Sequence, residues 1–184
     1  AEVQGVPATD QRDRRDVVLK KLNEKIDIKF AEGDNGIVSV AAAGNALLVS
    51  GFDHYTLETH TNPVTDRVDV FFKPNDSTPP FKISDRIKSG TMGGAISVRD
   101  QVIPDFKEKM DAIAYKLAEE VNKAHVEGFD RSGRQGVLFF DIPNTMAGAA
   151  KNISVNQAIL DDVNKVAAAA KPGAVGDNTV ANVI

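Results

Sequence analysis

The 184-residue chain contains no cysteine and only three histidines. The absence of cysteine excludes disulfide bonds, zinc–thiolate sites and a thiol nucleophile. His54, His60 and His125 have no second histidine or cysteine at the spacing of a metal site, so we expect solvated or hydrogen-bonded rings. We therefore predict no metal, no cofactor and no catalytic residue.

The sequence also lacks long apolar runs and an excess of basic residues. No stretch approaches the roughly 20 apolar residues that a membrane-spanning helix needs. The net charge is -4 and the isoelectric point is about 5.4, which argues against nucleic acid as a partner. The chain opens without the basic and then apolar pattern of a signal peptide. We expect neither a membrane nor a nucleic-acid partner.

Residues 95–126 form the most strongly patterned stretch and predict one long helix. Pro104 interrupts this pattern, because proline removes a backbone donor. The helix either begins at Pro104 or begins near Gly94 and bends at the proline, and we prefer the bend. Gly128 is expected to end the helix in the left-handed conformation. The apolar residues recur at steps of three and four on one face: Ile103, Phe106, Met110, Ile113, Leu117, Val121 and Ala124.

A second helix is predicted for residues 10–26, with Thr9 or Asp10 as its cap. Its apolar face is formed by Val18, Leu19, Leu22 and Ile26. This helix is the expected partner of the long one. We predict a main core built from Leu22, Ile26, Leu117 and Val121.

Between residues 27 and 83 the apolar pattern changes to a period of two, which predicts strands. Turn residues separate the strands closely, and short connections join antiparallel neighbours, so we expect a meander. The turns include 33–36 and 44–45. The predicted strands are 27–30, 37–42, 46–50, 55–59, 67–73 and, more weakly, 81–83.

The predicted fold class is α+β, with long helices packed together with a small antiparallel sheet. We divide the chain into an N-terminal helical part (1–26), an antiparallel β part (27–88) and a third part (89–184). The third part holds the long helix and an irregular or helical C-terminal region, and all three are expected to form one composite domain.

The C-terminal region contains two apolar runs, 137–140 and 153–155, that either form strands or pack loops onto the core. One or two short helical segments are predicted within 156–170. Asp177-Asn178 is typical of a helix cap, followed by the first turns of a helix. We expect both ends to be cut from a longer protein.

Two loops have weak likenesses to ligand-binding motifs. Residues 90–94 are glycine-rich before a helix but lack the lysine of a phosphate-binding loop, so a flexible helix entry is the better interpretation. Residues 130–136 lack the spaced oxygen ligands and closing glutamate of a calcium loop. We interpret this loop as a turn.

Several stretches together carry a family resemblance. Residues 9–16 are similar to a signature Asn-Asp-Leu-x-Asp-x-Arg-Asp, departing at Thr9 and Gln11, and Arg99-Asp100 follows a glycine-rich helix entry. Residues 121–130 are similar to Val-Asn-x-x-His-x-x-Gly-Tyr-Asp, with Phe129 in place of tyrosine. With 153–156 and 176–178 downstream, the chain resembles the FlgK family of flagellar hook-associated proteins.

The resemblance implies a structural subunit of the bacterial flagellum that joins hook to filament without catalysis. It implies type III export, an extracellular location, and a ring of copies that contacts the hook protein and the second hook–filament junction protein. Family members also have terminal helices that build an inner tube and, on the C-terminal side, bind an export chaperone. This chain is expected to be an internal fragment without those helices.

The resemblance marks eight residues as candidates for packing or subunit contact. An alternative function is an extracellular module that binds a glycan or a protein through its sheet. Phe52, Tyr55, Phe71, Phe72 and Phe81 would have to cluster on one sheet face for this alternative, although core positions suit them equally. The candidate contact residues are Arg12, Asp13, Arg15, Asp16, Arg99, Asp100, Asn122 and His125.

Overall fold

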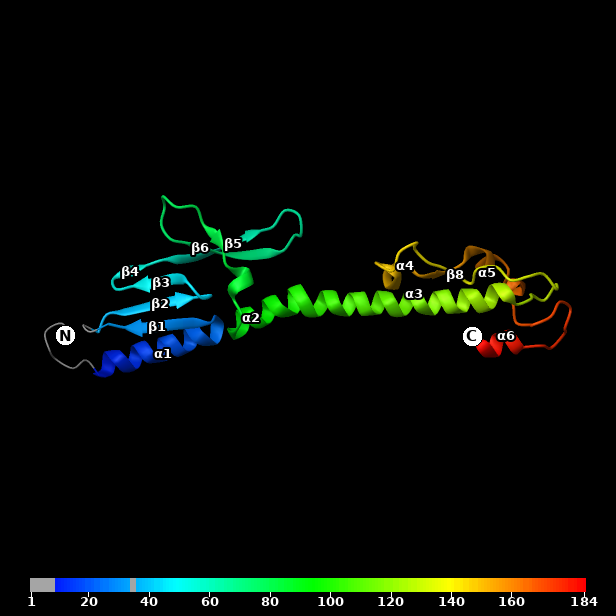
Figure 1. Ribbon diagram of the computed structural model, residues 1–184, viewed down its shortest axis with the longest axis horizontal. Helices are drawn as coiled ribbons and strands as arrows, with labels where there is room; N and C mark the ends of the chain where they lie inside the picture. Colours follow the sequence, from blue (N-terminus) through cyan, green and yellow to red (C-terminus); the bar gives the residue numbers. More distant parts are fainter. Residues whose placement is uncertain (1–8, 34–35) are drawn as a thin grey trace. The chain divides into compact units, whose positions relative to one another are not determined.

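The computed structural model describes residues 9–33 and 36–184 (Figure 1). These residues form two compact units, unit 1 up to Val102 and unit 2 from Ile103 to Ile184. The predicted turn at 33–36 therefore lies partly outside the described residues. Residues 1–7 lie wholly outside them. The boundary between the units falls after Val102. The three-part division of the sequence and the single composite domain stay predictions.

Unit 1 contains a helix, a series of short strands and a second helical stretch, as the sequence pattern predicts. Its helices and turns are α1 (Thr9–Lys25), η2 (Ser84–Arg86), α2 (Gly90–Ser97) and the π-helical η3 (Val98–Val102). Its strands are β1 (Ile28–Glu32), β2 (Val38–Ala42), β3 (Ala46–Ser50), β4 (Asp53–His54), β5 (Thr56–Thr61), β6 (Val68–Lys73) and β7 (Phe81–Lys82).

The strands of unit 1 form two antiparallel sheets, where a single meander was expected. One sheet has the order β1-β2-β3-β4 and the other β5-β6-β7. The chain changes sheet at Tyr55, whose N–H donates to the carbonyl of Leu48 (2.9 Å) before β5 turns to pair with β6. The period of two and the antiparallel neighbours are confirmed, whereas the single sheet was wrong.

The core of unit 1 lies where both sheets meet the end of α1. Ile26 and Ile83 are almost fully buried, and Leu22, Met92 and Ile96 pack around the buried cluster. The predicted role of Leu22 and Ile26 in a core is confirmed, but their neighbours are sheet residues and α2. The buried cluster is Ile26, Ala42, Ala43, Ala46, Leu48, Val70, Phe72, Ile83 and Ile87.

Unit 2 contains one long helix followed by short elements. They are α3 (Ile103–Glu127), β8 (Phe140–Asp141), α4 (Ala149–Asn152), β9 (Ser154–Val155), α5 (Gln157–Asp161), η4 (Val163–Lys165) and α6 (Thr179–Val183). β8 and β9 pair antiparallel, so both C-terminal apolar runs contain strands. Together the two units confirm the α+β class.

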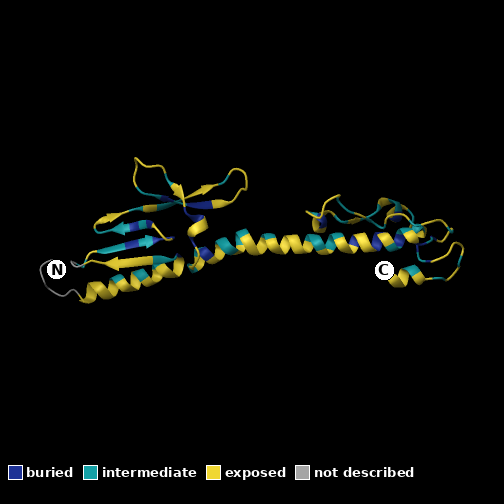
Figure 2. Ribbon diagram, viewed as in Figure 1, coloured by how far each residue is buried: buried dark blue, intermediate teal, exposed yellow. Residues whose placement is uncertain are grey.

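The apolar face of α3 is buried only near its C-terminal end (Figure 2). Val121 is buried, but the side chain of Leu117 is 55% exposed and that of Ile113 is 63% exposed. The prediction that Leu117 belongs to the main core was therefore wrong. Periodicity correctly places these residues on one face, but α4 and the segments after it pack on the adjoining side of α3, which carries Asp111, Asn122 and His125.

The preferred start of the long helix upstream of Pro104 is confirmed, whereas the conformation of Gly128 differs from expectation. Helical residues begin at Gly90, so the helix does not start at Pro104, and the π-helical η3 precedes the proline. α3 ends at Glu127 as predicted, but Gly128 does not have a positive φ. A Cβ at Gly128 would lie 3.0 Å from Val180 and 3.1 Å from Ala167, so close packing, and not backbone conformation, favours glycine there.

Candidate functional site

The candidate contact residues fall into three clusters, each inside one unit. The first joins α1 to the end of β1 through Glu32, which accepts from Arg15 (3.0 Å) and Arg12 (3.3 Å). Arg15 also pairs with Asp16 at 3.0 Å, whereas Asp13 is exposed. These contacts form a surface ion-pair network that ties the first turns of α1 to the sheet.

The second cluster holds η3 against β6. The guanidinium of Arg99 donates two hydrogen bonds to the carboxylate of Asp100 (2.8 and 2.7 Å), and its remaining nitrogen donates to the carbonyl of Val68. Arg67 donates to the same carboxylate at 2.9 Å. The hydrogen bond from Arg99, together with the positive charges of Arg99 and Arg67, lowers the pKa of Asp100.

A second carboxylate extends this network. The side chain of Asp69 is only 9% exposed and lies 3.1 Å from the ammonium of Lys82, which also approaches Asp85 at 3.5 Å. Burial raises the pKa of Asp69, but hydrogen bonds from Lys82 and Ser84 and the charge of Arg99 outweigh it, so the pKa of Asp69 is lowered. Asp69 and Asp100 therefore work as ionised acceptors inside a network of arginine and lysine.

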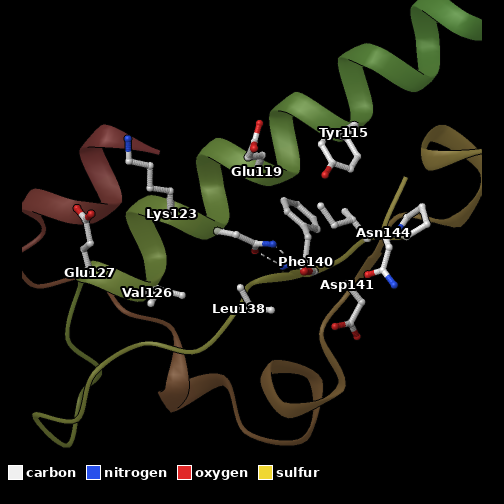
Figure 3. A pocket seen from close by; sticks show the side chains of 12 residues that line it. Tyr115, Glu119, Lys123, Val126, Glu127, Leu138, Phe140, Asp141 and Asn144 are labelled. Atoms are coloured by element: carbon white, nitrogen blue, oxygen red, sulfur yellow. Dashed lines mark hydrogen bonds between the residues drawn. The ribbon is translucent and has the colours of Figure 1, made fainter. Parts of the chain in front are cut away.

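The third cluster lies at the C-terminal end of α3 and begins with Asn122. Its side-chain amide donates to the carbonyl of Phe140 (2.9 Å) and accepts from the N–H of the same residue (2.7 Å) (Figure 3). The amide of Asn122 thus makes the two hydrogen bonds that a neighbouring strand would make. Through them α3 fixes the position of β8.

His125 is fully buried one turn further along α3. Its Nε2 accepts from the N–H of Ala167 (2.8 Å), so Nδ1 carries the ring proton and donates to the carbonyl of Val137 (2.6 Å). His125 joins α3 to two segments that are 12 and 42 residues away in the chain.

The loop after α3 is closed by a buried aspartate. Asp130 accepts from the backbone N–H groups of Ser132 and Arg134 (both 2.8 Å) and from the guanidinium of Arg134 (3.0 Å). The backbone hydrogen bond from Arg134, followed by that from Ser132, lowers the pKa of Asp130 despite its burial. Its oxygens serve the loop itself, which agrees with the interpretation as a turn.

Two fastening residues had no recognisable signal in the sequence. Asp111 on α3 accepts from the N–H groups of Gly148 (2.8 Å) and Ala150 (2.9 Å), and so caps α4 from another element. Gly136 lies so close to α3 that a Cβ would be 1.9 Å from the carbonyl oxygen of His125. Both roles depend on partners far away in the chain, which local spacing cannot indicate.

A groove of about 620 Å³ lies between α3 and residues 138–144 (Figure 3). Two of its acidic side chains have polar partners, since Glu119 pairs with Lys116 and Asp141 accepts from Asn156. Among the described residues, no group of three or more histidine, aspartate or glutamate side chains could hold a metal ion. No helix in the described ranges is long and apolar enough to cross a membrane.

The aromatic side chains of unit 1 mostly contact one another. Phe72 is buried, and its ring lies 6.0 Å from that of Tyr55 and 5.4 Å from that of Phe81. Phe71 contacts His60, whereas Phe52 is 92% exposed. The core interpretation is confirmed for Phe72, whereas Phe52 and Phe81 are exposed and only Phe81 of these two has an aromatic neighbour among the described contacts.

Comparison with known proteins places the chain among structural proteins of the bacterial flagellum. Residues 1–140 match the family described as the flagellar hook-associated protein FlgK helical domain, and the chain belongs to this family. The resemblance inferred from the separate sequence stretches is therefore confirmed.

Individual relatives agree with this assignment. The chain is 22% identical to flagellar hook-associated protein 1 of Salmonella typhimurium over 85% of this chain, and 25% identical to that of Bacillus subtilis over 90%. The FlgK hook junction protein of Burkholderia pseudomallei shares the fold, with a TM-score of 0.57, 24% identity, and coverage of 71% of this chain and 25% of that one. The chain spans only 30% and 38% of the lengths of the two sequence relatives.

Proposed function

We propose that this chain is part of a structural subunit that joins the flagellar hook to the filament and performs no catalysis. The match of residues 1–140 to the FlgK helical domain carries this proposal. The Burkholderia pseudomallei protein that shares the fold is a hook junction protein, which supports the more specific location. On the same basis we propose an extracellular position, type III export and a role in motility.

The clusters on α1, η3 and α3 support a scaffold. Arg15, Arg99, Asp100, Asn122 and His125 all bond to other parts of their own unit. We propose that these signature residues stabilise their own unit through hydrogen bonds and ion pairs. Subunit contacts then use other surfaces.

The proposed partners are the hook protein, the second hook–filament junction protein and further copies of the subunit in a ring. An export chaperone would bind only through a C-terminal region outside this chain. The test is a pull-down in which the chain, restored to full length, is mixed with hook protein and with the second junction protein. We expect both to be retained, and an unrelated filament-forming protein to be lost in washing.

Two outcomes would contradict the proposal. Failure of the restored protein to bind either partner would remove the junction role, and binding of a defined glycan by the sheet of unit 1 would replace it with the binding-module alternative. The variant Asn122→Ala of the restored protein distinguishes a residue that stabilises its own unit from one that contacts a partner. It should lose stability yet bind both partners at temperatures where it remains folded.

A further inference from the structure

One face of α3 carries a row of apolar side chains that its own unit leaves uncovered (Figure 2). The steps along this row alternate between three and four residues, which is the spacing of a helix that packs along a second helix. Each of the five residues is between 42% and 64% exposed. A continuous exposed apolar surface is typical of an interaction site. The apolar row consists of Ile103, Phe106, Met110, Ile113 and Leu117.

A different side of α3 holds the short elements of unit 2. Asp111, Asn122 and His125 bond from this side to the start of α4, to β8 and to residues 137 and 167. These segments therefore have their own place of attachment on the helix. Burial of the apolar row requires a further partner.

α6 already lies against the C-terminal end of the same face. A Cβ on Gly128 would be 3.0 Å from the side chain of Val180, so α6 begins beside the end of α3. Its last residues lie further back along α3, which makes the two helices antiparallel (Figure 1). There both helices line a hollow of about 300 Å³, and its apolar residues are Leu117, Val121, Ala124, Val183 and Ile184.

The charges beside the apolar row indicate what kind of helix fits it. Lys109, Lys116 and Lys123 are exposed and recur every seven residues along one edge, although Lys116 also pairs with Glu119 of its own helix. In paired helices the residues that flank the apolar contact select the partner by charge. Acidic flanking residues suit this edge. A second α3 packed antiparallel would place lysine beside lysine, which disfavours another copy as the partner.

We propose that the apolar row is the docking site for an acidic amphipathic helix of the same subunit, formed by residues that follow Ile184 in the full-length protein. This helix continues the direction of α6 from Leu117 towards Ile103, a distance of about 21 Å or roughly 14 helical residues. The matched region is only 30% and 38% of the length of the two sequence relatives, so a full-length member has ample chain for it. The inference does not depend on the hook–filament role.

Photo-crosslinking identifies what covers the apolar row. Benzoylphenylalanine is placed at position 113 of the full-length subunit, and the crosslinked peptides are mapped by mass spectrometry. We expect a crosslink within one molecule to residues that follow Ile184. The matched control is position 108, which is exposed on the opposite side of α3 and should not crosslink to that segment.

Four outcomes would overturn the proposal. They are a crosslink to residues on the N-terminal side of Ala1, a crosslink to a second copy, a crosslink to a different protein, and no crosslink at position 113 beyond that of the control. None of them bears on the junction role, because the experiment contains neither hook protein nor second junction protein.

Thiol labelling gives an independent measurement. Residues 1–184 contain no cysteine, so Met110→Cys introduces a single thiol, and any cysteine elsewhere in the full-length protein is replaced by serine. In the full-length protein this thiol should react at least about tenfold more slowly than in the 184-residue chain, because labelling then requires local opening. Glu108→Cys should react equally fast in both. Equal rates for Met110→Cys in the two proteins would overturn the proposal.

The lysine edge is tested in the same full-length background. The double variant Lys109→Glu/Lys116→Glu should return the labelling rate of Met110→Cys towards that of the 184-residue chain, because like charges would then face each other. Lys20→Glu on α1 makes the same change of charge at an exposed position and should leave the rate unchanged. A double variant in which Met110→Cys stays protected would overturn the acidic character of the docking helix.

Discussion

Unit 1 buries large apolar side chains of both sheets and of residues that directly follow α1 or flank η2, whereas unit 2 is held together largely by polar side chains on one helix. Ile26, Phe72 and Ile83 are at most 5% exposed in unit 1. In unit 2, Asn122 and His125 are buried and bond to backbone groups of β8 and of residues 137 and 167.

The difference follows from how much regular structure each unit has. The sheets of unit 1 satisfy their own backbone groups, so side chains are free to form an apolar core. Residues 128–184 of unit 2 contain only short elements, and many of their backbone N–H and C=O groups need other partners. Side chains of α3 supply them. A helix can therefore organise an irregular chain through amide, imidazole and carboxylate groups.

The largest effect is expected from Gly136→Ala in unit 2. The new Cβ would lie 1.9 Å from the carbonyl oxygen of His125 and 2.8 Å from the Cβ of Ala167, so backbone must move. We expect a loss of about 4 kcal/mol or more in the free energy of unfolding. Denaturant melts followed by amide exchange at Ala167 measure it.

Gly94→Ala is the control for this substitution. Gly94 lies on α2, where a Cβ would meet nothing within 4 Å. Alanine is favoured over glycine in a helix by about 1 kcal/mol, so this variant should be unchanged or slightly more stable. Equal losses in the two variants would show that the close approach at Gly136 is not what matters.

The role of apolar burial is tested by Ile83→Ala and Ile113→Ala, which remove the same atoms from a buried position in unit 1 and from an exposed position on α3. Ile83 is fully buried in unit 1, and its truncation should cost about 2–5 kcal/mol. Ile113 on α3 is 63% exposed, and its truncation should cost less than about 0.5 kcal/mol in this chain. A large loss in Ile113→Ala would mean that the apolar face of α3 is covered in solution.

His125→Phe tests the polar fastening of unit 2 with little change in ring size. It leaves the carbonyl of Val137 and the N–H of Ala167 without their partner, and each unsatisfied group costs about 1–3 kcal/mol. We expect a total loss of about 2–4 kcal/mol by denaturant unfolding. His54→Phe at an exposed position should change stability little. If the two variants melted alike, the hydrogen bonds of His125 would contribute nothing measurable.

The smallest expected effect is a loss of stability of unit 1 in acid. The pKa of Asp69 and the pKa of Asp100 are lowered in the folded protein, so their contribution is complete above the ordinary aspartate value of about 3.9. It is lost as pH falls below that value through the folded pKa. Urea melts between about pH 7 and 3 should show this fall, and Asp100→Asn should make it shallower. An equally steep fall in Asp100→Asn would contradict the assignment.

Local pattern was enough to predict much of unit 1. Alternating residues such as those of 38–42 and 46–50 became strands at the expected positions, because the period of two is a property of each strand alone. The α1 helix was predictable because its period is also a local property of the sequence, and the antiparallel neighbours because the connections between the strands are short. The change of sheet at Tyr55 could not be predicted, because either partner suits the same alternation.

The contacts of unit 2 were less accessible to sequence reasoning. The spacing of Ile113 and Leu117 shows that they share a helix face, but it does not say whether another element covers that face. The residue types of Asn122 and His125 mark them as candidates through the family resemblance, yet their partners are fixed only by the path of the C-terminal segments. Asp111 lies among other charged residues of α3, and nothing in the neighbouring sequence indicates that it caps α4.

The amide of Asn122 has a consequence for solubility. An open strand edge offers unpaired N–H and C=O groups on which a strand from another molecule can add, and this is a common route to aggregation. At Phe140 both groups are already taken by one side chain of the same unit. The side of β8 that faces α3 is thereby closed to an incoming strand, without the need for a charged or proline residue in the strand itself.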